Sequence, residues 1–396
     1  MPYLGKCWVY YKPGDVRLEE RSFTCGREEL LVRVRVCGRC GTDSTIFRKG
    51  HESVDPYAPV ILGHELVAEI VEVGKRVKHL AEGIGYRQGT QLSSEYLDFE
   101  VGERVTFQSR IARYRDGLML IPNPIANLSF RMDGGYSQYM KVPPEMIQSE
   151  SVLRVVDAIS DEAACLAEPA ACALESIFAT PHPIGVDASG RHIYQAGIRK
   201  GGRACVIGSG TVSMIYAVLA KIEGAKEVFI LVRSEEKAQI VRRILGEGFK
   251  ICITGKTDRL SMAEKVDAET RLVAELKEKT GGELFDDVVA ACSDPDAQRL
   301  MPRLYAPDGY SVGACFGGTH ELVERVDMDL HHYRAAKTIG TSGCSTAAMK
   351  TILAWLESGS LRPEGFIEAR HWTFSDRPGY FFSSTGALKP VLYPWE

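Results

Sequence analysis

Four side chains of this sequence have the chemical types that a catalytic zinc ion needs: Cys40, His64, Glu65 and Glu168. They offer a thiolate, an imidazole and two carboxylates, all of which bind Zn²⁺ in proteins. A catalytic zinc keeps one position for water or substrate, whereas a structural zinc is closed by four protein ligands. Three firm ligands and one looser carboxylate fit the catalytic case. Taken singly, each residue also has an ordinary interpretation as a buried thiol, a core histidine or a surface charge.

Two strand-like segments must position the first three of these side chains. Residues 30–36 alternate apolar and basic side chains, and this run ends in Cys37-Gly-Arg-Cys40-Gly-Thr-Asp43. Residues 60–74 are apolar on both sides of the His64-Glu65 pair. Polar side chains inside such a run need a partner if they are buried, and a metal ion provides one.

A second motif lies near the middle of the chain. The stretch that begins at Gly201 and runs through Ser213 predicts a buried strand and a glycine turn, followed by an apolar helix through Ile222. This is the start of a dinucleotide-binding βαβ unit, whose helix N-terminus receives the pyrophosphate. A second strand follows over residues 227–232, and further helices and strands alternate to residue 314. The turn residues expected at the cofactor are Gly208, Gly210, Thr211 and Val212, with Ser213 where a third glycine is usual.

The end of the strand over residues 227–232 predicts which cofactor binds. An acidic residue at this place holds the ribose 2′-hydroxyl of NAD, whereas an arginine pairs with the 2′-phosphate of NADP. Here Val232 takes the place of the acidic residue, and Arg233 and Ser234 follow it. A planar guanidinium suits a phosphate, so NADP is predicted over NAD. The alternatives are that Arg233 is an ordinary surface residue or that Glu235 reaches the ribose.

Together these motifs resemble the zinc-dependent medium-chain dehydrogenase/reductase family, from about residue 25 to the C-terminus. The resemblance rests on Cys40-Gly-Thr-Asp43, Gly63-His64-Glu65 and Glu168-Pro169, and it is closest to the sorbitol, threonine and glucose dehydrogenase branches. It implies an α/β protein, with a GroES-like β-rich catalytic domain over residues 1–169 and 342–396. It also implies a Rossmann domain, a doubly wound parallel sheet, over residues 170–341.

The resemblance also implies roles for individual residues. Thr42 matches the residue that begins the proton relay, Asp43 orients the Cys40 loop, and Lys389 matches a basic residue that contacts the cofactor pyrophosphate, although it is equally compatible with a surface lysine. Many members carry a relay histidine five residues after the cysteine, but this chain has Thr45 there. His51 does not match that position and is expected to be a surface or pocket-rim residue.

One zinc ion is expected rather than two. The family often carries a structural zinc on four closely spaced cysteines, but this chain has no cysteine between Cys40 and Cys165. The corresponding lobe, residues 108–127, is expected to be held by packing alone. Two segments have no counterpart in the family pattern, residues 79–99 and 181–200, and we interpret them as insertions that shape a pocket or an interface.

Composition narrows the possible partners. The chain has 396 residues, 48 basic and 52 acidic side chains and a net charge of −4, which gives no electrostatic signature for nucleic acid or an anionic membrane. Neither a membrane span nor a signal-peptide core is evident. Eleven scattered cysteines favour reduced thiols and a cytoplasmic location. We expect a small-molecule substrate and a homodimer or homotetramer.

The predicted activity is hydride transfer between NAD(P) and a small polar secondary alcohol or ketone, such as a polyol, a sugar or a sugar derivative. An alternative in the same family is threonine-type oxidation of a hydroxy-amino acid. Another is a thiol-disulfide protein that uses Cys37 and Cys40, but residues 41–50 lack the pattern of the helix that such a motif requires. A structural zinc knot, a metal-free reductase and a non-catalytic binding protein are the remaining alternatives.

Overall fold

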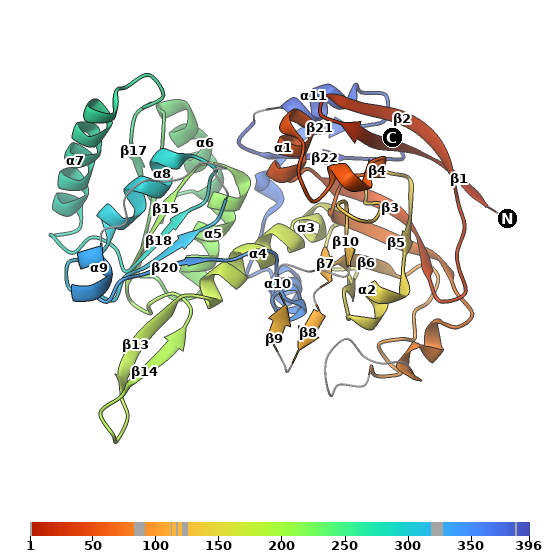
Figure 1. Cartoon of the computed structure of the whole chain (residues 1–396), viewed down its shortest axis with the longest axis horizontal. Helices are drawn as coiled ribbons and strands as arrows, with labels where there is room; N and C mark the ends of the chain where they lie inside the picture. Colours follow the sequence, from red (N-terminus) through yellow and green to blue (C-terminus); the bar gives the residue numbers. More distant parts are fainter. Residues whose placement is uncertain are drawn as a thin grey trace. The chain divides into compact units, whose positions relative to one another are not determined.

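The computed structural model describes residues 2–82, 92–111, 113–115, 118–120, 126–317, 328–384 and 386–396. The chain forms two compact units (Figure 1). Unit 1 comprises Met1–Ala171 and Gly343–Glu396, and unit 2 comprises Cys172–Ser342. No helix in the described parts of the chain is long and apolar enough to cross a membrane.

Unit 1 is built mainly from antiparallel strands. Its largest sheet has the order β12-β6-β5-β3-β22-β21, and β11 also pairs with β3. The bounds of these strands are β3 Leu30–Gly38, β5 Glu65–Val73, β6 Arg104–Phe107, β11 Tyr139–Val142, β12 Val152–Arg154, β21 Ile367–Trp372 and β22 Lys389–Leu392. A second sheet pairs β1 (Tyr3–Lys12) with β2 (Asp15–Phe23) and β4 (Val60–Ile61). Two short pairs join β7 (Arg110–Ile111) to β10 (Ala126–Asn127), and β8 (Arg113–Arg115) to β9 (Leu118–Leu120).

The helices of unit 1 lie between these strands in the sequence. They are α1 Gly41–Lys49, α2 Pro144–Gln148, α3 Asp161–Cys165, α10 Thr346–Glu357 and α11 Pro378–Ser383, and α4 (Ala167–Phe178) leads into unit 2. An aromatic cluster at the centre of the core includes Trp8, Tyr136 and Phe381, all buried. Burial of such large apolar surfaces is the main force that holds the unit together.

Helix α1 corrects one expectation from the sequence. Residues 41–50 have weak helix propensity, yet residues 41–49 form α1 because both ends carry strong signals. Asp43 accepts a hydrogen bond from the Cys40 N–H (3.2 Å) in the first turn, and the last turn is basic. Gly50 ends the helix with a φ of 78°, a conformation that favours glycine.

Unit 2 confirms the predicted doubly wound parallel sheet. Its strand order is β17-β16-β15-β18-β19-β20, and each neighbouring pair is parallel. The strands are β15 Arg203–Ile207, β16 Glu227–Val232, β17 Lys250–Ile253, β18 Asp287–Ala290, β19 Val312–Cys315 and β20 Lys337–Gly340, and the helices are α5 Thr211–Ile222, α6 Glu235–Leu245, α7 Met262–Lys279, α8 Pro295–Leu300 and α9 Met328–Tyr333. The strand order reverses direction at β15, which places a ligand-binding position at the carboxyl end of that strand.

Of the two predicted insertions, the structure describes residues 181–200 fully and residues 79–99 only in part. Residues 181–200 contain an antiparallel hairpin of β13 (Pro181–Val186) and β14 (His192–Ala196), which projects from unit 2 (Figure 1). In the other insertion, residues 83–91 lie outside the described residues. Much of the predicted lobe, including residues 121–125, lies outside them as well.

Candidate metal centre and cofactor-binding loop

Three of the four predicted metal ligands converge in unit 1. One ligand atom from each of Cys40, His64 and Glu65 lies within 4.8 Å of the other two. The cause is strand pairing, because Gly38 at the end of β3 lies opposite Glu65 at the start of β5. Gly63 turns the chain just before this point with a φ of 94°, and a Cβ at Gly63 would meet the Cys37 sulfur at 2.8 Å.

The His64 ring is oriented by groups on its far side. Ser129 Oγ lies 2.9 Å from His64 Nδ1, Asp43 Oδ1 lies 3.8 Å from the same nitrogen, and the ring also bonds to the Cys40 side chain. Burial by itself would lower the pKa of His64, but Cys40 and Asp43 outweigh it and raise that pKa well above its usual value. A buried site that stabilises a positive charge so strongly also suits a metal cation. The donor set therefore fits zinc.

Asp43 occupies the position expected of a residue that supports the Cys40 loop. Its Oδ2 accepts hydrogen bonds from the Tyr136 hydroxyl (2.6 Å) and from the Cys40 N–H (3.2 Å). Its Oδ1 is buried and has no hydrogen-bond partner among the residues that the structure describes. Burial raises the pKa of this carboxyl, although His64 and Tyr136 lower it. The unpaired oxygen faces the His64 side of the site, where a positive charge would satisfy it.

Lys389 forms a buried ion pair that the sequence did not predict. Its buried Nζ lies 2.8 and 2.6 Å from the two Glu65 oxygens and 3.1 Å from the Arg39 carbonyl oxygen. An ammonium group has three N–H bonds, and these three acceptors match them. The alternative of a surface lysine is therefore wrong, because Lys389 is buried in an ion pair with Glu65, whereas its contact with a cofactor pyrophosphate stays a prediction. Burial would lower the pKa of Lys389, but Glu65 and Cys40 raise it.

The fourth predicted ligand, Glu168, is buried near this group but is not one of its members. Its Oε1 accepts a hydrogen bond from the Ser109 hydroxyl (2.7 Å), and a carboxylate oxygen lies within 4.8 Å of the Cys344 sulfur. Burial raises the pKa of Glu168, while the nearby His64 lowers it. The electrostatic interaction with His64 places the carboxylate close to the candidate metal centre.

The remaining relay and redox candidates lie on α1 and its flanks. Thr42 is half-buried in the first turn of α1, directly after the Cys40-Gly pair. The His51 ring packs edge-on against Phe130 with centroids 5.4 Å apart, and Phe130 also neighbours His64.

Cys37 is fully buried, and burial raises its pKa well above the usual range. A thiol in that state does not form a reactive redox pair, which argues against the thiol-disulfide alternative.

The predicted cofactor loop in unit 2 connects β15 to α5. Gly208 has a φ of 139°, which favours glycine, and a Cβ there would meet Ser213 Oγ at 2.5 Å. Gly210 is the N-cap of α5, and its side-chain position is open, with nothing within 4 Å of a Cβ placed there. Since no side chain caps α5, the N–H groups of its first turn, which begins with Thr211 and Val212, suit a pyrophosphate. The loop therefore fits a dinucleotide.

The predicted ribose contacts lie at the end of β16. Ser234 Oγ accepts a long hydrogen bond (3.4 Å) from the Lys237 N–H and caps α6. Arg233 is half-exposed and pairs with Asp258 and Asp294. Sequence reasoning missed both of these aspartates, and it also missed Ser129. Ser129 has a φ of 66°, and only an alignment of metal-site neighbours would have drawn attention to it.

Comparison with known proteins shows which proteins this chain is similar to. Residues 26–85 match the alcohol dehydrogenase GroES-like domain. The (R,R)-butanediol dehydrogenase of Bacillus subtilis is 26% identical over 69% of this chain and 66% of its own length, and the sorbitol dehydrogenase of Gallus gallus is 26% identical over 66% and 64%. The chain thus spans just under two thirds of the length of these curated relatives.

Solved structures show the same fold over the whole chain. The 2R,3R-butanediol dehydrogenase of Bacillus subtilis has a TM-score of 0.75 at 20% identity, covering 98% of this chain and 99% of that one. The galactitol-1-phosphate dehydrogenase of Escherichia coli has a TM-score of 0.71 at 18% identity, covering 98% and 100%. Residues 26–85 therefore match the alcohol dehydrogenase GroES-like domain, and the chain as a whole has the fold of these dehydrogenases and is similar in sequence to zinc-type medium-chain alcohol dehydrogenases.

Proposed function

We propose that this protein is a zinc-dependent NAD(P) dehydrogenase that interconverts a small polar secondary alcohol and its ketone, with NADP as the preferred cofactor. The observation that carries the proposal is the convergence of Cys40, His64 and Glu65 in unit 1 of a chain whose unit 2 has a dinucleotide-binding loop. The curated relatives named for butanediol and sorbitol support an alcohol or polyol substrate. The presence of Arg233 after Val232 supports NADP.

The protein groups have separate roles in this proposal. A bound zinc ion supplies a Lewis acid for the substrate oxygen. Cys40 and His64 would hold the ion, and Glu65 and Glu168 would supply the carboxylates. The Thr42 hydroxyl is proposed to accept the proton of the substrate hydroxyl. Since Thr45 stands where relatives carry a relay histidine, the proton would then leave through water or the cofactor ribose.

Metal analysis tests the site. Purified protein is expected to contain about one equivalent of zinc, and Cys40→Ser and His64→Ala are each expected to lose it. Cys25→Ser is the matched control, because Cys25 is a free, half-buried thiol of the same unit away from the ligand group. Retention of zinc by both site variants, or zinc-free wild-type protein that cannot be reconstituted, would contradict the proposal.

Cofactor reduction tests the reaction. The zinc-loaded protein is incubated with NADP⁺ or NAD⁺ and a panel of polyols, sugars, diols and L-threonine, and absorbance is followed at the wavelength of the reduced nicotinamide. We expect reduction with at least one polyol or diol. Turnover of L-threonine alone would favour the hydroxy-amino-acid alternative. Disulfide exchange without any cofactor reduction would refute the dehydrogenase assignment.

A further inference from the structure

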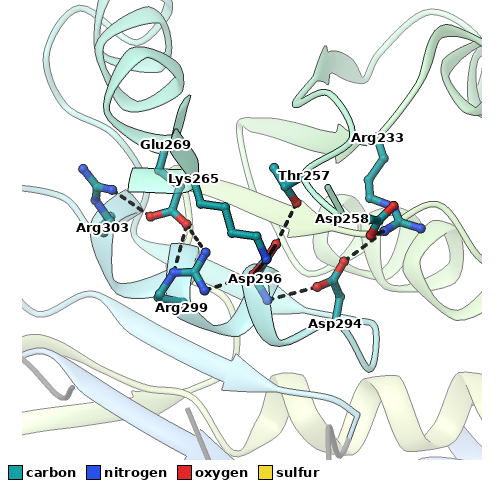
Figure 2. A network of polar contacts seen from close by, with 9 residues as sticks. All are labelled: Arg233, Thr257, Asp258, Lys265, Glu269, Asp294, Asp296, Arg299 and Arg303. Atoms are coloured by element: carbon teal, nitrogen blue, oxygen red, sulfur yellow. Dashed lines mark hydrogen bonds and ion pairs between the residues drawn. The ribbon is translucent and has the colours of Figure 1, made fainter. Parts of the chain in front are cut away.

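Arg233, the residue at the predicted ribose site, does not stand alone. Its Nη1 lies 3.0 Å from Asp258 Oδ1 and 3.3 Å from Asp294 Oδ2 (Figure 2). Asp258 follows β17 and Asp294 follows β18, so both come from the carboxyl ends of strands in the sheet that carries Arg233. One cation and two anions therefore meet where a dinucleotide ribose is expected.

Asp296 is a common neighbour of Asp294 and of the loop that carries Asp258. Asp294 Oδ1 accepts a hydrogen bond from the Asp296 N–H (3.0 Å) and caps α8. Thr257, adjacent to Asp258, donates its hydroxyl to Asp296 Oδ2 (2.7 Å). Lys265 and Arg299 pair with the Asp296 carboxylate in turn (Figure 2). The Asp294 carboxylate is thus fixed at the start of α8, and the chain next to Asp258 is anchored through Thr257, so both negative charges stay near Arg233.

We propose that Asp258 and Asp294 set the cofactor selectivity of this protein by opposing Arg233, so that its preference for NADP over NAD is small and both cofactors bind. This inference rests on the proposed function. It adds two specificity-determining residues to the ribose site and predicts the direction in which each changes selectivity.

The charges of Asp258 and Asp294 decide whether these residues weaken or strengthen the binding of a 2′-phosphate. Both hydrogens of Arg233 Nη1 point to carboxylates, which leaves the Nε–Nη2 edge for a 2′-phosphate. A phosphate on that edge would lie roughly 7 Å from each carboxylate, and it carries a charge of about −1.5 to −2. At this distance and physiological salt, each carboxylate should weaken phosphate binding by about two- to fivefold. The 2′-hydroxyl of NAD carries no charge and does not experience this repulsion.

A positioning role for the carboxylates would act in the opposite direction. By holding the guanidinium, Asp258 would help it to bind phosphate. However, Arg233 and Asp258 are both more than half exposed, at 53% and 62%, and an ion pair this exposed contributes little. The repulsion between the carboxylates and the 2′-phosphate is large because the phosphate carries a charge of about −1.5 to −2. The positioning effect is small because it only orients the exposed Arg233 side chain. Repulsion should therefore dominate.

The test measures equilibrium binding of NADPH and NADH to the zinc-loaded full-length protein by calorimetric titration. Asp258→Asn is expected to tighten NADPH binding about two- to fivefold and to change NADH binding less than twofold. The gain should shrink at 1 M NaCl, because salt screens the repulsion. Arg233→Ala should weaken NADPH binding more than NADH binding. Asp267→Asn, which removes an exposed charge from α7 away from Arg233, is the control and should change neither.

The outcomes separate the inference from the proposed function. Weaker NADPH binding in Asp258→Asn would show that the carboxylate positions Arg233, and an unchanged ratio of the two affinities would show that it has no effect on selectivity; either overturns the inference. Asp258→Ser, which removes the same charge with a smaller side chain, must shift the ratio in the same direction as Asp258→Asn. A zinc-loaded wild-type protein that binds neither cofactor would refute the proposed function itself.

Discussion

Replacing Lys389 by methionine tests the buried ion pair beneath the candidate metal centre. Lys389 and Glu65 are 4% and 1% exposed, and their charged atoms lie 2.6 Å apart. Methionine preserves most of the side-chain volume but leaves the Glu65 carboxylate buried without its cation. Breaking such a pair typically costs about 3–5 kcal/mol, a large part of the total stability of a protein. We expect a loss of this size for the zinc-free protein.

Tryptophan fluorescence in urea is the appropriate assay. The four tryptophans, Trp8, Trp355, Trp372 and Trp395, all belong to unit 1, so their emission reports the unfolding of that unit. With a urea dependence of about 2–3 kcal/mol per molar, the expected loss lowers the midpoint by roughly 1–2 M. Lys141→Met, which removes an exposed lysine from β11 of the same sheet, is the control and should shift the midpoint little.

A double-mutant cycle separates the ion pair from other effects. Glu65→Gln should cost less than Lys389→Met, because removing the Glu65 charge takes away a main cause that raises the pKa of Lys389, and burial then favours the uncharged lysine. The double variant should recover part of the loss, with a coupling energy of at least about 2 kcal/mol. Zinc should reduce the loss in Lys389→Met, since a cation beside Glu65 replaces the missing charge. Additive single effects, or a loss no larger than that of the control, would refute the reasoning.

Other predictions concern single sites. Ser129→Ala removes the hydroxyl beside His64 Nδ1 and should weaken zinc binding about 10- to 100-fold in a chelator competition, whereas an unchanged affinity would show that Ser129 does not orient the ring. Gly208→Ala should destabilise unit 2 by about 1–3 kcal/mol in calorimetry, because its φ of 139° disfavours a side chain. Burial raises the pKa of Cys25 to about 11, so its thiolate fraction, and its carboxymethylation rate by peptide mass spectrometry, should rise about tenfold per pH unit between pH 8 and 10. A rate that is flat over this range would contradict the raised pKa.

The sequence predicted those features that depend on local pattern. The alternation in residues 30–36 and the apolar run around His64 indicated β3 and β5, and their pairing places Cys40 near His64. The glycine turn after residue 207 and the alternating helices and strands indicated the parallel sheet. These signals are short in range, because a strand or a βαβ turn is specified by residues that are neighbours in the chain.

Contacts between distant residues were not predictable in this way. Lys389 is 324 residues from Glu65, and Ser129 is 65 residues from His64. A lysine or a serine in isolation has no pattern that names its partner, so the family resemblance suggested a cofactor contact for Lys389 but did not predict its ion pair with Glu65. Helix α1 was missed for a different reason. Helix propensity is an average over a segment, whereas the formation of α1 depends on two residues near its ends, Asp43 and Gly50.

The missed contacts share one physical effect, which is to fix charged or polar ligand groups before any metal binds. Ser129 orients the His64 ring, Lys389 holds both oxygens of Glu65, and Ser109 holds one oxygen of Glu168. A ligand that is already oriented loses little conformational entropy when a cation arrives, and its charge is already partly compensated. The candidate ligands can be recognised from the types of residue in the sequence, but the zinc affinity that we propose for the site would depend on these partners. Because a partner needs only a hydroxyl or an ammonium at the right place, many segments can supply it, and only the folded chain shows which ones do.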